Sequence, residues 1–292
     1  MRRFTACVSL AAAIVVASPE AQTTKKNFMW AVRAPGAPPT YLMGSLHVLT
    51  PEYYPLSSDI EKAFAEAKVL IEEVDLDEMT NPTTMVSLLG RAMLADSRTL
   101  DQVISADLYA KVVARAEKAG LPGAAIRRMK PWMAALALTT PALAAAGFDP
   151  NLGLDKHFFD RAKKAGLERR AFETVAFQFD RLDQMSATDQ EAMLRSTVDD
   201  LDTQLSDVKA IADAWSRGET KTLEKLLLTA TSASPGLYKR LLVERNEAWV
   251  GPVEACLTQK ISCFVVVGAA HLVGPDSLVA MLRKRGYSVE QQ

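Results

Sequence analysis

The pattern Gly-x-x-His occurs twice in this chain, each time directly after a short apolar run with strand character. The first copy, residues 44–47, follows residues 41–43, and the second, residues 268–271, follows residues 264–267. Both copies lead through two apolar residues and a turn into a helix-like stretch, and strands that alternate with helices predict an α/β fold. The chain has 3 histidines, and histidine is the usual side chain for metal ligation and proton transfer. This pair is therefore the first candidate for chemistry.

Short apolar runs and longer helical stretches alternate along the whole chain. The runs with strand character are residues 28–32, 41–46, 69–74, 170–172, 263–267 and 287–289. The alternation predicts an α/β fold with a mixed or largely parallel central sheet. The helical share is large, and we expect many helices, including those in residues 81–146 and 187–234, to form a surrounding layer or cap. No segment has the character of an interdomain linker, so residues 22–292 are expected to form a single domain.

The N-terminus has the order of regions that is typical of a secretory signal peptide. Two arginines come first, residues 6–17 are small, apolar and uncharged, and a polar break follows. The apolar part is too short for a membrane-spanning helix. We expect residues 1–21 to be a signal peptide that is cleaved after Ala17 or Ala21, and a buried N-terminal helix is the alternative. The mature protein would then be periplasmic or secreted, with no stable membrane insertion.

Cysteine usage agrees with export. After removal of residues 1–21, only Cys256 and Cys263 remain. An oxidising compartment would allow them to form a disulfide. The alternative is a pair of unbonded, half-buried thiols, and the spacing does not match a metal-binding motif.

Composition limits the class of partner. Hydrophobic residues make up 49% of the chain, charged residues 24%, and the net charge is −1. A chain with this balance has no electrostatic basis for binding nucleic acid. The expected partner is a peptide or a small-molecule substrate, whose identity the sequence does not reveal.

Several carboxylates fall at or near the ends of the predicted strands. Residues 69–74 carry Glu72 and Glu73 and continue into Asp75, and alternation places Glu73 and Asp75 on one face and Glu72 on the other. Glu173 follows another strand, and Asp155 opens a helix. In open α/β sheets, ligands bind at the carboxyl ends of the strands. A carboxylate inside so apolar a strand needs a partner or a metal.

Two histidines and several carboxylates at strand ends predict a divalent-metal site. Zinc, manganese and cobalt all accept nitrogen and oxygen ligands of this kind. Such a metal would lower the pKa of a bound water, with a spare glutamate as general base. Each residue also has a plainer interpretation. His47 or His271 could be a hydrogen-bonded structural residue, Glu73 could pair with a buried arginine, and Asp155 could cap a helix.

Arg245 stands on the apolar face of a predicted helix. It shares a stripe with Leu241, Ala248 and Trp249. An arginine in such a position usually meets a carboxylate or an anionic ligand, so a structural ion pair and a contact with substrate are both open. Motifs of other enzyme classes are missing: the chain has no Gly-x-Ser-x-Gly, no His-Glu-x-x-His and no glycine-rich phosphate loop.

These motifs together resemble the TraB/GumN family, whose relatives include the Tiki metalloproteases that cleave Wnt proteins. The resemblance covers most of the chain, and its motifs are YLMGSLHVL at residues 41–49, VLIEEVD at 69–75, KPW at 130–132, GLDKHFFDRAKKAG at 153–166, FETVAFQ at 172–178, RNEAW at 245–249 and VVGAAHLVGPDSLVAMLRKRGY at 266–287. It implies that the paired Gly-x-x-His motifs and the acidic residues form the proposed metal-dependent active site of the family. The residues it singles out first are His47, Glu73 and His271, followed by Asp155, Glu173 and Arg245.

The resulting hypothesis is an exported metal-dependent hydrolase, with a peptidase as the specific form. The expected metal ligands are His47, His271, Glu73 and Asp155, and the expected catalytic residues are Glu73, Glu173 and Arg245. The two histidines are expected side by side at one end of the sheet. Two alternatives remain: an esterase-like hydrolase that uses His and Glu without metal, and a non-catalytic periplasmic factor that binds or assembles polysaccharide or envelope.

Overall fold

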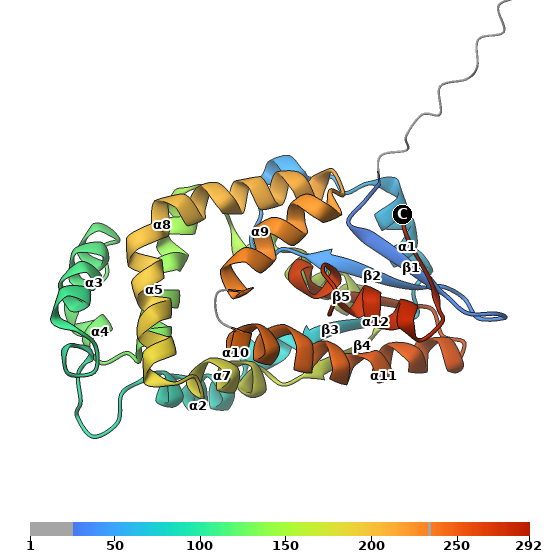
Figure 1. The fold of residues 1–292 in the computed structure, drawn as a ribbon. Helices are drawn as coiled ribbons and strands as arrows, with labels where there is room; N and C mark the ends of the chain where they lie inside the picture. The colour runs from blue at the N-terminus through green and yellow to red at the C-terminus, as the bar shows by residue number, and fades with distance from the viewer. Residues whose placement is uncertain (1–25, 233–234) are drawn as a thin grey trace, which may run out of the picture.

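A mixed β-sheet forms the centre of the molecule. The computed structural model describes residues 26–232 and 235–292, and the predicted signal peptide, residues 1–21, lies outside them. Within the described residues, six strands form one sheet in the order β4-β3-β5-β2-β1-β6 (Figure 1). Their bounds are β1 (Met29–Arg33), β2 (Thr40–Ser45), β3 (Val69–Val74), β4 (Glu168–Glu173), β5 (Cys263–Gly268) and β6 (Ser288–Gln291). The predicted α/β fold with a mixed sheet is confirmed.

Four neighbouring strands run parallel. β4 pairs with β3, β3 with β5 and β5 with β2 in parallel, whereas β1 is antiparallel to both β2 and β6. The residues of β5 read Cys-Phe-Val-Val-Val-Gly and are almost all buried, as expected for a strand that is covered on both faces. The parallel set brings the carboxyl ends of β2, β3, β4 and β5 to the same edge of the sheet. Ser45, Val74, Glu173 and Gly268 end these strands.

Helices cover both faces of the sheet. On one face, α1 (Ser58–Glu66) and α6 (Leu154–Ala165) meet β5 through Phe64, Phe158 and Phe264, whose ring centroids lie 4.8 to 5.4 Å apart. On the other face lie α11 (Glu244–Thr258) and α12 (Leu278–Lys284). Cys263 precedes Phe264 in β5 and points to the face of α11 and α12, since side chains alternate along a strand.

A group of helices forms a second hydrophobic core beside the sheet. These helices are α3 (Ala106–Lys118), α4 (Gly123–Arg127), α5 (Pro131–Ala145) and α8 (Ala187–Ser216), and Figure 1 shows them at the end of the molecule away from β1. Their buried apolar side chains form a cluster distinct from that of the sheet. The surrounding helical layer therefore includes a lobe with a core of its own. The remaining helices are α2 (Pro82–Ala92), α7 (Val175–Asp183), α9 (Thr220–Ser232) and α10 (Pro235–Tyr238).

The long helix α8 connects the lobe to the sheet. Helical periodicity predicts a helix over residues 189–202, but α8 continues to Ser216. Near its end, the indole Nε1 of Trp215 donates a hydrogen bond of 2.8 Å to the carbonyl oxygen of Gly44. A side chain at position 44 would overlap the ring of Phe28. The glycine of the first Gly-x-x-His motif thus allows a close approach within the core.

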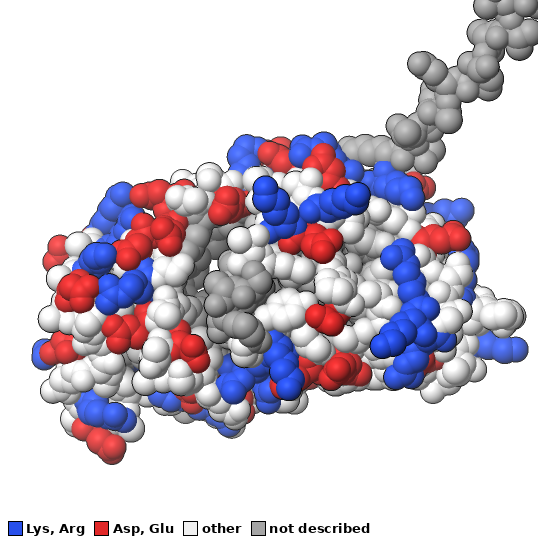
Figure 2. Space-filling view, in the orientation of Figure 1, with Lys and Arg blue, Asp and Glu red and all other residues white. Residues whose placement is uncertain are grey.

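The surface carries charges of both signs. Figure 2 shows lysines and arginines interspersed with aspartates and glutamates on the visible face, as expected for a net charge of −1. In the part of the chain that the structure describes, no helix is long and apolar enough to cross a membrane.

Cys256 of α11 and Cys263 of β5 form a disulfide, so the predicted pairing is confirmed. Both cysteines are fully buried. The bond connects the end of α11 to the start of β5 and closes a loop between residues 7 positions apart.

Replacing both cysteines with alanine is expected to lower the free energy of unfolding by about 2 kcal/mol, because a short closed loop restricts the unfolded chain. Equilibrium unfolding in urea of the exported protein measures this difference. The wild-type protein in reducing buffer serves as a control, since it loses the cross-link without a change of side chain. Unchanged stability in both samples would contradict the prediction.

Candidate active site

The guanidinium of Arg245 lies between two carboxylates at the carboxyl edge of the sheet. Its Nη2 is 2.6 Å from Oε2 of Glu73 and 2.9 Å from Oε2 of Glu173. Its Nε donates to Oε1 of Glu173 at 2.9 Å, and its Nη1 donates to the carbonyl oxygen of Leu241 at 3.1 Å. Of the two interpretations of Arg245, the ion pair is confirmed. The three charged side chains are only 6 to 10% exposed. Because they are buried, the two carboxylates depend on the guanidinium of Arg245 to offset their charge.

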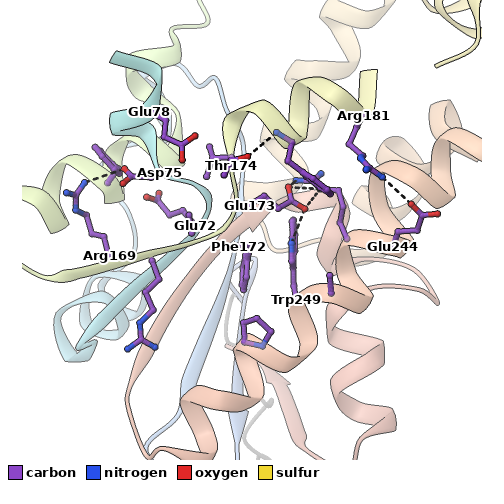
Figure 3. A pocket seen from close by; sticks show the side chains of 18 residues that line it. Glu72, Asp75, Glu78, Arg169, Phe172, Glu173, Thr174, Arg181, Glu244 and Trp249 are labelled. Carbon is purple, nitrogen blue, oxygen red and sulfur yellow. Dashed lines mark hydrogen bonds and ion pairs between the residues drawn. The ribbon is translucent and has the colours of Figure 1, made fainter. Parts of the chain in front are cut away.

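Aromatic side chains support this ion cluster from α11 and β4. The Arg245 guanidinium carbon lies 4.6 Å from the ring centroid of Trp249, one turn further along the helix. The indole of Trp249 donates to Oε1 of Glu173 at 3.1 Å and stacks on Phe172 at 4.9 Å. Figure 3 shows Phe172 and Trp249 side by side below Glu173. A π-helical segment, η5 (Lys239–Val243), leads directly into α11, and such segments are frequent at functional sites.

Glu73 is buried and ionised. Its Oε1 accepts the backbone N–H of Gly268 at 2.7 Å, and its Oε2 accepts the side-chain amide of Gln178 at 2.9 Å as well as Arg245. Burial alone would raise the pKa of Glu73, but the electrostatic effects of His271, Arg245 and His47, together with the N–H of Gly268, outweigh it and hold the pKa at about 2. The second motif glycine thus brings its backbone N–H directly to a carboxylate.

His271 is neutral, and both of its ring nitrogens make hydrogen bonds. Its Nε2 lies 3.1 Å from Nη1 of Arg245, which can only donate, so Nε2 accepts and the ring proton is on Nδ1. Nδ1 then donates to Oδ1 of Asn246 at 2.7 Å, and the Asn246 amide nitrogen donates to the carbonyl of Asp276 at 2.8 Å. Burial lowers the pKa of His271 to about 3. This imidazole is therefore uncharged at neutral pH.

His47 has the opposite character. Its Nδ1 donates to Oδ2 of Asp155 at 2.8 Å, and its side chain is 72% exposed. The negative charge of Asp155 and this hydrogen bond raise the pKa of His47 to about 9. Asp155 also accepts a hydrogen bond from the hydroxyl of Ser45. His47 is thus an imidazolium at neutral pH, with Nδ1 fixed and Nε2 free.

Two adjoining cavities meet at this edge. A cavity of about 200 Å³ is lined by His47 and Asp155 on one side and by Glu73 and Gln178 on the other. A larger cavity of about 700 Å³ follows β4 and reaches Arg245, and Figure 3 shows its walls. Glu72 and Val74 line both cavities.

Glu72 stands at the junction of the two cavities. Its side chain points to the face of the sheet opposite to Glu73, as the alternation of β3 predicts. It is 4% exposed, and its Oε1 has no hydrogen-bond partner among the described residues. Burial raises the pKa of Glu72 to about 9, so the group is a neutral acid.

The sequence profile of the TraB/PrgY/gumN family matches residues 28–291. The chain belongs to the TraB/PrgY/gumN family. Among its relatives, metalloprotease TIKI2 of Xenopus tropicalis is 24% identical over an alignment that covers 93% of this chain and 61% of that protein. The uncharacterized protein YbaP of Shigella flexneri is 24% identical, with 86% of this chain and 90% of that protein covered. An uncharacterized protein of Treponema pallidum is 23% identical, with 92% and 84% covered.

This TraB/PrgY/gumN chain spans about three-fifths of the length of the TIKI2 metalloproteases that it matches. No solved structure matches it.

The structure divides the six predicted site residues into two groups. Glu73, Glu173, Arg245 and His271 form one connected network, and His47 and Asp155 form the other. Asp75 belongs to neither, because β3 ends at Val74 and Asp75 instead caps the short helix η2 (Leu76–Thr80). The prediction that Asp75 shares a face with Glu73 extended the alternation one residue too far.

Four polar residues of the site were not predicted as functional. They are Ser45, Glu72, Gln178 and Asn246. Gln178 and Asn246 lie inside the family motifs FETVAFQ and RNEAW, which were the only signal for them. Glu72 was noted for its face of the strand, and Ser45 gave no signal beyond its place in the first Gly-x-x-His motif.

Glu73 and His271, two of the expected metal ligands, are engaged by the protein itself. Both oxygens of Glu73 already accept hydrogen bonds. The free lone pair of His271 faces the cationic guanidinium of Arg245 at 3.1 Å, where a second cation would be repelled. Among the described residues, no group of three or more histidine, cysteine or acidic side chains could hold a metal ion. In this arrangement Glu73 and His271 do not fit a divalent metal, because both already contact the cationic guanidinium of Arg245.

Replacing Arg245 with methionine is expected to lower the free energy of unfolding by about 3 to 5 kcal/mol, because two buried carboxylates lose their cation. The pKa of Glu73 would rise, so the variant should regain stability as the pH falls. Urea unfolding at several pH values measures both effects. Arg245→Lys is the matched control, since it keeps the charge and should lose less stability. A loss below about 1 kcal/mol in Arg245→Met would contradict the assignment.

Gly153 holds His47 and Asp155 together through the backbone. The N–H of the next residue, Leu154, donates to the carbonyl of Leu46 at 3.0 Å. A Cβ at position 153 would overlap the carbonyl oxygen of His47.

Gly153→Ala is therefore expected to cost about 1 to 3 kcal/mol of stability through overpacking. It should also bring the pKa of His47 back towards its ordinary value as Asp155 moves away, and NMR titration of His47 reads this directly. Gly123→Ala is the control, because nothing lies within 4 Å of a Cβ there. If the His47 pKa is the same in both variants, Gly153 does not position the pair.

Proposed function

We propose that this protein is a hydrolase that cleaves a peptide or similar acyl bond in the cavity of about 200 Å³ between His47 and Glu73. One observation carries the proposal: a protonated, exposed imidazole and an ionised, buried carboxylate face the same cavity. The cavity lies at the carboxyl edge of a parallel set of strands, where α/β folds bind their ligands. The relatives named metalloprotease support a hydrolase or peptidase, although only at 24 to 25% identity.

In the proposed reaction, Glu73 positions the attacking water. Its Oε1 accepts one hydrogen bond, from Gly268, and a second lone pair remains for water. Because the pKa of Glu73 is low, it receives the proton of the water late, after the bond to the carbonyl carbon has begun to form. His47 Nε2–H donates its proton to the leaving nitrogen or oxygen as that bond breaks. Transfer of the proton from Glu73 to His47 through solvent restores both groups.

Arg245, Glu173 and His271 act as positioning residues in this scheme. Arg245 keeps Glu73 ionised and in place, and Glu173 holds Arg245 from the opposite side. His271 adds an acceptor without adding charge. We propose no step through a metal, because Arg245 already contacts both Glu73 and His271. A metal-dependent form would require Arg245 to leave Glu73 and His271.

Export to the periplasm or beyond is part of the proposal. It is supported by the sequence of residues 1–21 and by the buried disulfide, since disulfides persist in oxidising compartments.

The purified mature protein is expected to hydrolyse an unfolded polypeptide, and to keep this activity after treatment with a chelator. Glu73→Gln and His47→Ala should each lower kcat by about 100-fold or more, as expected for groups that transfer protons. His157→Ala is the control, because this third histidine contacts Tyr54 and Arg161 instead of the cavity.

Three outcomes would contradict parts of the proposal. Activity that is lost on chelation and restored by zinc would favour the metal-dependent form. Full activity in Glu73→Gln would exclude this carboxylate from the chemistry. Complementation of a deletion strain by His47→Ala would favour a non-catalytic binding or assembly factor.

The proposed acid role of His47 sets the pH dependence. The charge of Asp155 raises the pKa of His47 to about 9, so the imidazolium is present below that pH and lost above it. Activity should therefore fall as the pH rises through about 9. In Asp155→Asn, the pH at which activity falls on the alkaline side should move down towards the ordinary histidine pKa of about 6.5. The profile of kcat/KM against pH measures this, and an unchanged position of this fall in Asp155→Asn would assign the ionisation to another group.

A further inference from the structure

The strand β4 forms an open edge of the sheet. It pairs only with β3 among the described strands, so the outward N–H and C=O groups of its backbone have no partner strand. Ala171, in its second half, is exposed and offers little side-chain obstruction. An exposed edge is a template for pairing with another chain, and most proteins cover it.

A groove runs along this open edge. The cavity of about 700 Å³ is lined by six consecutive residues, 169–174, and by side chains from both faces of the sheet. Its lining includes Phe159 of α6 and Ala248, Trp249 and Pro252 of α11, and Figure 3 shows Trp249 beside Phe172 of β4. Its volume falls within the range of ligand sites, which is roughly 300 to 1,000 Å³. A strand added to β4 would lie between Phe159 and the α11 residues, beside the charged side chains that also line the groove.

The groove continues into the candidate active site. It shares Glu72 and Val74 with the smaller cavity that holds His47 and Glu73. Glu72 pairs in register with Ala171 across the β3–β4 ladder, and its Oε1 is buried without a hydrogen-bond partner among the described residues. A buried polar atom of this kind normally has a partner.

We propose that an extended polypeptide segment binds along β4 as an added strand and passes Glu72 into the cavity between His47 and Glu73. Every second residue of the strand turns its N–H and C=O groups to the open edge, so these donors and acceptors repeat about every 6.6 Å, a spacing that another polypeptide chain matches along its length. The groove is lined by apolar residues such as Phe159 and Trp249 and by charged residues such as Arg170 and Glu244, so it suits a segment that carries side chains of both kinds. The catalytic consequence rests on the proposed function, whereas the docking itself requires no turnover.

Backbone methylation of the peptide tests the docking. The probe is a set of fluorescent decapeptides that tile the sequence of an unfolded α-lactalbumin, and binding is measured to full-length mature His47→Ala, which keeps the buried cluster intact. The best binder is then made in two forms, N-methylated at odd or at even residues. In an added strand, alternate N–H groups face the partner. We expect one form to bind at least about tenfold more weakly and the other about as well as the parent peptide.

A groove variant and amide exchange locate the site. Ala248→Trp fills the α11 wall and should weaken binding by about tenfold. Glu247→Trp places the same side chain on an exposed neighbouring residue that does not line the groove, and should leave binding unchanged. Added peptide should slow hydrogen exchange at amides of β4.

The outcomes separate the docking from the proposed hydrolysis. Peptide that binds β4 but is not cleaved by the wild-type protein would support the docking and contradict the hydrolase. The opposite result is a peptide that is cleaved, although both methylated forms bind equally well and Ala248→Trp has no effect on binding. This result would retain the hydrolase and overturn the docking. Binding of a neutral oligosaccharide such as cellohexaose, with no decapeptide bound at about 1 mM, would also overturn it.

Discussion

The ion cluster around Arg245 is the contact on which the rest of the site depends. One guanidinium compensates two buried carboxylates that come from β3 and β4, so the cluster of Arg245, Glu73 and Glu173 keeps one net negative charge. His271 accepts a hydrogen bond from the same guanidinium without changing this balance. An uncompensated buried charge is costly, and the imidazolium of His47 lies across the adjoining cavity. The arrangement thus keeps Glu73 ionised in the same cavity as the imidazolium of His47.

The two Gly-x-x-His motifs look equivalent in sequence and are not equivalent in space. β2 and β5 are parallel neighbours, but Gly44 pairs with Val267 and Ser45 with Gly268, so the motifs are offset by one residue. After Gly268 the chain enters the short helix η6 (Ala269–Leu272), which turns His271 into the core. Neither motif glycine has a positive φ. Both therefore serve by leaving room for close neighbours and not by forming a left-handed turn. The imidazoles consequently differ in burial, charge and partner.

Local patterns predicted the fold well because they report burial. The apolar runs gave all the strands of the described sheet, and the stripe of α11 gave the ion pair of Arg245. Local sequence patterns do not show which side chains that are far apart in the chain come into contact. Arg245 and Glu73 are 172 positions apart, and nothing local indicates that a second carboxylate, Glu173, shares the same guanidinium. For the same reason the sequence left a metal and a buried arginine open as partners of Glu73, because it does not show which of them lies beside the carboxylate.

The same cluster also explains how an edge strand can stay ordered with one neighbour. β4 is fixed near its start by Arg169, which donates to Asp77, and at its end by Glu173, which accepts from Arg245 and Trp249. Phe172 adds its stacking on Trp249. Between these anchors the backbone at Ala171 stays open. A strand that is held at both ends and free along its outer edge needs no rearrangement to accept another strand, so the contacts that keep Glu73 ionised also preorganise the surface beside it.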